Sequence, residues 1–116
     1  TVLHVGWRGL LHGIVQSGVA PLHGTGLAAV IGPGIGPCCY EVGPDVGEPF
    51  AARFGADVRR DGRLDLWTSA ERALEAAGCA RVERLDLCTY CNPDLFFSER
   101  RTGKPRGTHG VIGLVT

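Results

Sequence analysis

Residues 27–40 read LAAVIGPGIGPCCY, and the expected architecture follows from this stretch. Residues Leu27–Ile31 form a continuous apolar run, which is typical of a strand that is buried on both faces in the middle of a sheet. The nine residues Gly32–Tyr40 contain three glycines and two prolines. Because this composition excludes regular structure, we predict a buried strand that is followed by an irregular loop.

The segment upstream predicts a strand end followed by a helix. Residues Thr1–Val5 read as the end of a strand, and Gly6 marks the point where the pattern changes. We expect a strand-to-helix turn over residues 6–9. The apolar positions that follow at helical spacing are Leu10, Leu11, Ile14 and Val15.

Two helices are predicted downstream of the loop. Val46, Phe50 and Phe54 are spaced four residues apart, and Gly55 and a charged turn at residues 59–62 follow them. A second helix is predicted over Leu66–Ala77, preceded by Asp65 and ended by Gly78. Its apolar stripe consists of Ala70, Ala73, Leu74 and Ala77.

The last third of the chain predicts two short strands around a loop. Residues Val82–Leu87 and Val111–Val115 have strand-like patterns, and Cys88–Ser98 between them reads as a loop. A basic group follows that loop and consists of Arg100, Arg101, Lys104 and Arg106. The mixed order of helices and strands indicates an α/β or α+β layered protein.

The composition limits the size and the partners of the protein. A chain of 116 residues supports one modest core, and 12 basic against 12 acidic residues give no surface for nucleic acid or an anionic membrane. No apolar run or leader suggests a membrane or secretion, so we expect a soluble cytoplasmic protein. The chain starts inside an apolar run without a methionine, from which we expect it to be part of a longer protein.

The cysteines allow several interpretations. Five cysteines, two of them adjacent, favour reduced thiols in the cytosol. The Cys88-x-x-Cys91 spacing is that of half a zinc knuckle or of a thiol redox pair. Cys38 and Cys39 could complete a four-sulfur structural site only if the two loops meet, and buried, inert thiols are the favoured interpretation.

Four polar features are individually ambiguous. His4 at a strand end could hold a metal or act as a base, although most such histidines are structural. Arg8, at a helix start, could equally pair with a neighbouring carboxylate. The glycines at 32–36 lack the lysine of a P-loop, but their backbone N–H groups could form an anion nest. The basic group after residue 98 is more typical of a solvated loop.

Taken together, four motifs resemble one family. They are H-x-G-W-R-G from His4, I-G-P-x-I-G-P-C-C-Y-E-V from Ile31, D-L-W from Asp65, and C-T-Y-C-N-P-x-L-F-F-S-x-R-R from Cys88. This set, in order over residues 4–101, resembles the YfiH-like family, also labelled multicopper polyphenol oxidoreductase (laccase domain) and purine nucleoside phosphorylase. Glu99 departs from the family pattern, which usually has an aromatic residue or histidine there.

The resemblance implies an α+β fold, a layered α/β/β/α sandwich with mixed sheets, of which residues 1–116 form the C-terminal part of a single domain. It also implies a zinc ion with an open position, held by two histidines and a cysteine. His4 matches the last of these ligands, and the other two lie upstream in the family. None of the cysteines at 38, 39, 88 and 91 matches the ligand cysteine.

The activities implied are phosphorolysis of purine nucleosides (adenosine, inosine and methylthioadenosine) and deamination of adenosine. The expected partners are therefore a purine nucleoside and phosphate, with a homodimer as a further possibility. We assign His4 and Arg8 as catalytic candidates, and Arg8 and the glycine loop as groups that orient phosphate or ribose. The candidate substrate-binding residues are Gly34, Gly36, Cys38, Tyr40 and Arg101.

Three alternatives stay open at this point. A copper-dependent laccase would need on the order of ten histidine and cysteine ligands, and the chain has four histidines. A cysteine hydrolase could use Cys38 or Cys39 as the nucleophile near His4. The chain could also be an inactive fragment or a non-catalytic module whose cysteines are structural.

Overall fold

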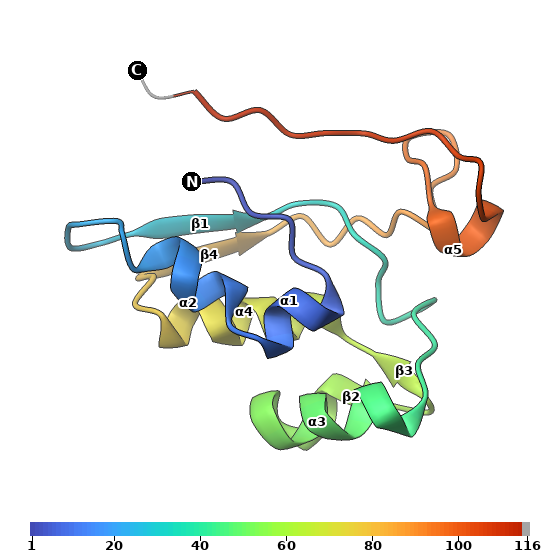
Figure 1. The fold of residues 1–116 in the computed structure, drawn as a ribbon, viewed down its shortest axis with the longest axis horizontal. Coiled ribbons are helices and arrows are strands. Elements are labelled where there is room, and N and C mark those ends of the chain that lie inside the picture. The colour runs from blue at the N-terminus through green and yellow to red at the C-terminus, as the bar shows by residue number, and fades with distance from the viewer. Residues whose placement is uncertain (115–116) are drawn as a thin grey trace.

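A computed structural model describes residues 1–114 and shows helices packed on one face of a small parallel sheet (Figure 1). Among these residues no helix combines the length and apolarity that crossing a membrane requires. In chain order the elements are α1 (Trp7–Leu11), α2 (Ile14–Val19), β1 (Ala28–Ile31), α3 (Pro44–Phe54), the 3₁₀ turn η1 (Ala56–Val58), β2 (Arg59–Arg60), β3 (Arg63–Leu64), α4 (Leu66–Ala76), β4 (Arg81–Arg84) and α5 (Glu99–Thr102).

The sheet consists of β1 and β4, which pair in parallel with Ala28 opposite Arg81. Helices α2 and α4 lie on one face, so the inward residues Ala29, Ile31 and Val82 pack against the core (Figure 1). Val30 points to the other face and is 64% exposed. The prediction of a strand buried on both faces in mid-sheet is therefore wrong within residues 1–114, because no layer covers the outer face there.

The two predicted downstream helices are confirmed as α3 and α4. Helix α4 begins after Asp65, whose carboxylate accepts hydrogen bonds from the Thr68 backbone N–H at 2.9 Å and from its hydroxyl at 2.7 Å. Gly55 and Gly78 follow the two helices with φ of 113° and 101°, a region that other residues rarely adopt. The charged turn at 59–62 lies in the hairpin of β2 and β3.

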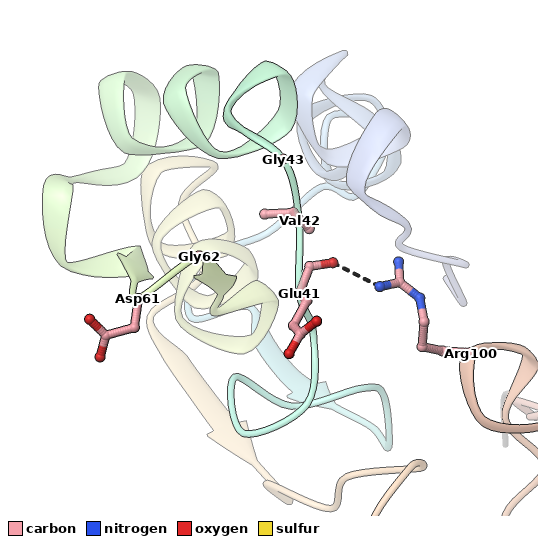
Figure 2. Close-up of a pocket in the computed structure, with 6 residues that line it drawn as sticks. All are labelled: Glu41, Val42, Gly43, Asp61, Gly62 and Arg100. Atoms are coloured by element: carbon pink, nitrogen blue, oxygen red, sulfur yellow. Dashed lines mark hydrogen bonds between the residues drawn. The ribbon is translucent and has the colours of Figure 1, made fainter.

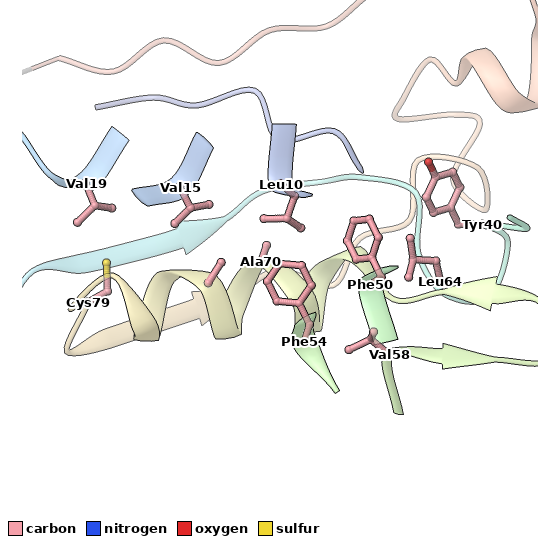
Figure 3. Close-up of a cluster of buried hydrophobic side chains, with 11 residues drawn as sticks. Leu10, Val15, Val19, Tyr40, Phe50, Phe54, Val58, Leu64, Ala70 and Cys79 are labelled. Atoms are coloured by element: carbon pink, nitrogen blue, oxygen red, sulfur yellow. The ribbon is translucent and has the colours of Figure 1, made fainter. Parts of the chain in front are cut away.

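One apolar core joins the helices to the inner face of the sheet (Figure 3). Leu10 from α1 and Phe50 from α3 are fully buried, and the Phe50 and Phe54 rings lie 5.4 Å apart. The helical spacing that was read at Leu10–Val15 is confirmed, although Gly13, with φ of 86°, divides it into α1 and α2. Burial of these side chains supplies the main stabilisation of the fold.

Three predicted strands differ from the structure. Residues 1–5 belong to no strand, and Leu3 instead packs on Gly18, so closely that a Cβ there would lie 2.5 Å from its Cδ1. The strand predicted over 82–87 is β4, which ends at Arg84, before Asp86 takes a left-handed φ of 50°. Residues 111–114 are also outside any strand, and Val115 lies outside the described residues.

Candidate functional site

The irregular loops that follow β1 and β4 meet at one end of the sheet. Because β1 and β4 are parallel, their C-terminal ends lie side by side, and the loops that follow them start next to each other. The Gly34 N–H donates to the Leu87 carbonyl at 3.2 Å, and the Thr89 N–H donates to the Gly34 carbonyl at 3.1 Å. This bridge between Gly34 and Cys88 brings together cysteines that are about fifty residues apart.

The two loops that carry the four cysteines therefore meet, as a four-sulfur site requires. The cysteine cluster consists of Cys38, Cys39, Cys88 and Cys91, whose sulfurs all lie within 4.8 Å of one another. The Cys91 sulfur is 3.5 Å from that of Cys38 and 3.3 Å from that of Cys39. Cys88 is buried, whereas Cys38 and Cys91 are exposed, so the favoured interpretation of buried thiols is wrong for Cys38 and Cys91. These residues could hold a metal ion.

The thiols of the cluster differ in their acidity. Burial raises the pKa of Cys88, but the backbone N–H groups of Gly36, Cys91 and Tyr90 outweigh it and bring the pKa down to about 7. The Gly36 N–H donates to the Cys88 sulfur at 3.2 Å. Partial desolvation and the adjacent thiols raise the pKa of Cys38, and the hydrogen bond with Cys91 raises that of Cys39. Cys88 is therefore the thiol that ionises most readily of these three.

The loop after β4 is held by Arg101. Its guanidinium donates to the carbonyls of Thr89 at 2.6 Å, Tyr90 at 3.0 Å and Phe96 at 2.7 Å. The Asn92 side chain donates to the Cys88 carbonyl at 2.8 Å. Arg101 thus orders the backbone between Cys88 and Phe96, and its assignment to substrate binding stays a prediction.

The loop after β1 is shaped by Trp67 of α4. A Cβ added at Gly36 would lie 2.5 Å from the Trp67 ring, so only glycine fits there. The N–H groups of Gly34 and Gly36 already donate to Leu87 and Cys88. These two N–H groups are not free for an anion, so the expectation of an anion nest is wrong for them. Substrate contacts by these glycines stay a prediction.

A shallow pocket lies between Arg100 and the segment at 41–43 (Figure 2). Arg100 donates to the Glu41 carbonyl at 2.7 Å and lies 5.1 Å from the centre of the Tyr40 ring. Burial raises the pKa of Tyr40 and Arg100 partly offsets this, so the phenol stays protonated near neutral pH. Tyr40 is 8% exposed and belongs to the core, while its assignment to substrate binding stays a prediction.

His4 lies in the irregular segment before α1, and Arg8 lies on α1. Both side chains are exposed, and the His4 ring lies beside Gly6, where a Cβ would be 3.8 Å from Nε2. The Arg8 guanidinium stacks 4.9 Å from the centre of the Trp7 ring. No carboxylate among residues 1–114 forms an ion pair with Arg8, so within that range it is not held by a neighbouring acid.

Comparison with known proteins identifies the family. A family model described as "Multi-copper polyphenol oxidoreductase laccase" matches residues 1–115. The chain belongs to this laccase family. The YfiH-like resemblance is thereby confirmed.

Several relatives of this laccase family have names that describe an activity. A purine nucleoside phosphorylase of Xylella fastidiosa is 40% identical over 86% of this chain and 43% of its own length. Purine nucleoside phosphorylase YfiH of Escherichia coli is 33% identical over 84% of this chain and 44% of its own. The human purine nucleoside phosphorylase LACC1 is 31% identical over 99% of this chain and 30% of its own. The chain thus spans less than half the length of these relatives.

A solved structure confirms the fold of this laccase-family chain. The crystal structure of Neisseria meningitidis protein NMB0706 matches with a TM-score of 0.77 and 33% identity, over 86% of this chain and 45% of that one. The predicted α+β class is confirmed, with helices and small sheets as the structure shows.

The described part of this laccase-family chain does not form a metal site around His4. Among residues 1–114, the one group of at least three clustered ligands is the cysteine cluster, which contains no histidine. A zinc site with an open position needs three protein ligands, and these residues supply one. Residues 1–114 alone therefore do not form a catalytic zinc site.

Sequence reasoning missed two contributors to the site. In the sequence Trp67 is part of the D-L-W motif and Arg100 is part of a basic group, and neither pattern predicts a role at the site. Trp67 packs on Gly36, and Arg100 donates a hydrogen bond to the Glu41 carbonyl. Both contacts join segments that are distant in sequence, so the spacing of residues within one segment does not predict them. The departure at Glu99 has a local partner, because its carboxylate pairs with Arg106 at 2.8 Å.

Proposed function

We propose that the protein containing these residues catalyses the phosphorolysis of purine nucleosides, with Arg8 binding the phosphate. The observation that carries the proposal is the Arg8 guanidinium, four residues after His4, which is exposed and forms no ion pair with a carboxylate of the described residues 1–114. The names of the relatives support the reaction class. Adenosine, inosine and methylthioadenosine are the proposed substrates.

In this reaction a phosphate oxygen attacks C1′ of the ribose and the bond from C1′ to N9 of the purine breaks. The electron pair of that bond leaves with the purine, which takes up a proton. A guanidinium donates two parallel hydrogen bonds to phosphate oxygens and is always charged at neutral pH. Arg8 would therefore orient the nucleophile, and stacking on Trp7 limits its side-chain freedom.

We also propose that His4 is one ligand of a zinc ion whose other ligands come from parts of the protein outside these residues. Adenosine deamination, in which water replaces the amino group at C6 and ammonia leaves, is proposed as a second activity of the same site. The fact that the chain spans less than half of its bacterial relatives supports this division of the ligands.

Substitution of Arg8 in the intact protein tests the proposal. We expect Arg8→Ala to raise the KM for phosphate about tenfold to a hundredfold, since a hydrogen bond to a charged group contributes about 1.5–3 kcal/mol. The KM for the nucleoside should change little. The measurement is release of the free purine from inosine at varied phosphate concentrations.

Arg81→Ala is the matched control, because Arg81 is 73% exposed and lies on β4, a strand that contains neither His4 nor Arg8. It should leave the phosphate dependence unchanged. An unchanged phosphate KM in Arg8→Ala would refute the role of Arg8. Zinc content that is unaffected by His4→Ala would refute the ligand assignment.

A further inference from the structure

The cysteine cluster has nearly the dimensions of a tetrathiolate cage. Tetrahedral zinc, with Zn–S bonds of about 2.3 Å, holds its four sulfurs about 3.8 Å apart. Here two sulfur pairs lie 3.3 and 3.5 Å apart, and none of the four is more than 4.8 Å from another. These two distances and the upper bound of 4.8 Å each differ from that spacing by about 1 Å or less, so small shifts of the sulfurs would complete the coordination.

The same geometry does not single out a disulfide. The Cys91 sulfur is almost equally distant from Cys38 and Cys39, so neither is the preferred partner. A bridge between adjacent cysteines such as Cys38 and Cys39 is strained. Any one disulfide would also leave two thiols of the cluster unused, whereas one metal ion engages all four.

The surroundings of the cluster suit a charged metal–thiolate group. Four thiolates with a divalent ion carry a net charge of about −2, which hydrogen-bond donors and cations stabilise. The Gly36 N–H points at the Cys88 sulfur, and the Arg101 guanidinium binds the carbonyls between Cys88 and Cys91. Cys38 and Cys91 are exposed, which gives an ion a path from solvent.

We propose that the cysteine cluster binds one structural zinc ion, which ties the loop after β1 to the loop after β4. Tetrahedral sites of four sulfurs select zinc or iron, and a closed zinc site with no open position supports folding rather than catalysis. The site is separate from the ligand proposed at His4. It stands on the cluster alone and does not depend on the proposed phosphorolysis.

The experiment uses the intact protein, purified under reducing conditions from medium containing zinc. Zinc is counted by mass spectrometry of the metal, and the ion is then exchanged for cobalt(II). We expect thiolate-to-cobalt charge-transfer bands together with intense visible bands of tetrahedral cobalt. The double variant Cys88→Ser with Cys91→Ser should lose one zinc per chain and most of the intensity of these bands, because the cluster supplies four thiolates. Cys79→Ser, a buried cysteine outside the cluster, should keep both.

His4→Ala separates this site from the proposed catalytic one, because it should keep the zinc and the strong thiolate bands of the four-cysteine cluster whatever happens to turnover. If the double variant does not fold, titration of the His4→Ala protein with a mercurial should release one zinc as the four thiols of the cluster react. Unaltered zinc content in a folded double variant would overturn the proposal. So would a disulfide within the cluster in protein isolated without reductant, or iron or copper in place of zinc.

Discussion

The helical core and the loop pair are held together in different ways. The helical core comprises α1–α4, where Leu10 and Phe50 lose all contact with solvent. The loop pair, residues 32–41 and 85–98, depends on individual contacts: Arg101 with three carbonyls, Asn92 with one, and a group of thiols. Burial is distributed over many atoms, whereas a point contact fails when one residue is replaced. The two regions should therefore respond differently to substitution.

The largest expected effect is in the core. Phe50→Ala should lower the free energy of unfolding by about 3–5 kcal/mol, because it removes a fully buried ring and leaves a cavity. Urea unfolding followed by circular dichroism measures it, and the loss should extend to the loops because they rest on the core. Leu95→Ala, at a loop residue 67% exposed, is the control. Equal losses in the two variants would break the comparison.

A smaller and more local effect is expected in the loop pair. Arg101→Gln removes the charged donors of the Thr89, Tyr90 and Phe96 carbonyls, and hydrogen bonds to charged groups contribute about 1.5–3 kcal/mol. Hydrogen exchange read by mass spectrometry should show faster exchange over residues 88–98, with α4 almost unchanged. Arg100→Gln, which loses one bond to Glu41, should show less. Uniformly faster exchange throughout the chain would mean that the loops are not a separate unit.

The difference between the helical core and the loop pair also explains how much of each could be predicted from the sequence. The spacing of Phe50 and Phe54, and the cap at Asp65, are local signals, so helices α3 and α4 were predicted almost to their ends. The apolar run at β1 indicated a strand but not its uncovered outer face, because burial depends on layers that the run itself does not contain.

The loop pair could be predicted only in part. The motif at Cys88–Cys91 suggested half of a metal site, but its meeting with Cys38 and Cys39 depends on the parallel pairing of β1 and β4. That pairing joins residues about fifty positions apart. The fit of Trp67 on Gly36 depends on the same pairing and on the position of α4, so no pattern within one segment could reveal it.

The smallest expected effect comes from a single ion pair at the edge of the helical core. It tests whether a point contact behaves the same way in the core as in the loop pair. Arg72 of α4 donates to both carboxylate oxygens of Asp57 in η1, at 2.8 and 2.7 Å, and this lowers the pKa of Asp57. A pKa lowered on folding stabilises the protein above the pKa of the unfolded chain, about 3.9 for aspartate. That contribution disappears as the pH falls through the lower pKa of the folded state.

Asp57→Asn should therefore lower the urea midpoint slightly at pH 7, by less than Arg101→Gln, because the pair is solvent-exposed and screened. The difference from the unaltered protein should shrink as the pH is lowered below about 4, since both proteins then lack the charge. Asp94→Asn, at an exposed loop carboxylate, is the matched control and should leave the urea midpoint at pH 7 unchanged. If the difference in urea midpoint persisted at low pH, Asp57 would stabilise the protein through packing and not through its charge. The stability of the core would then depend on exposed residues at its edge as well as on its buried side chains.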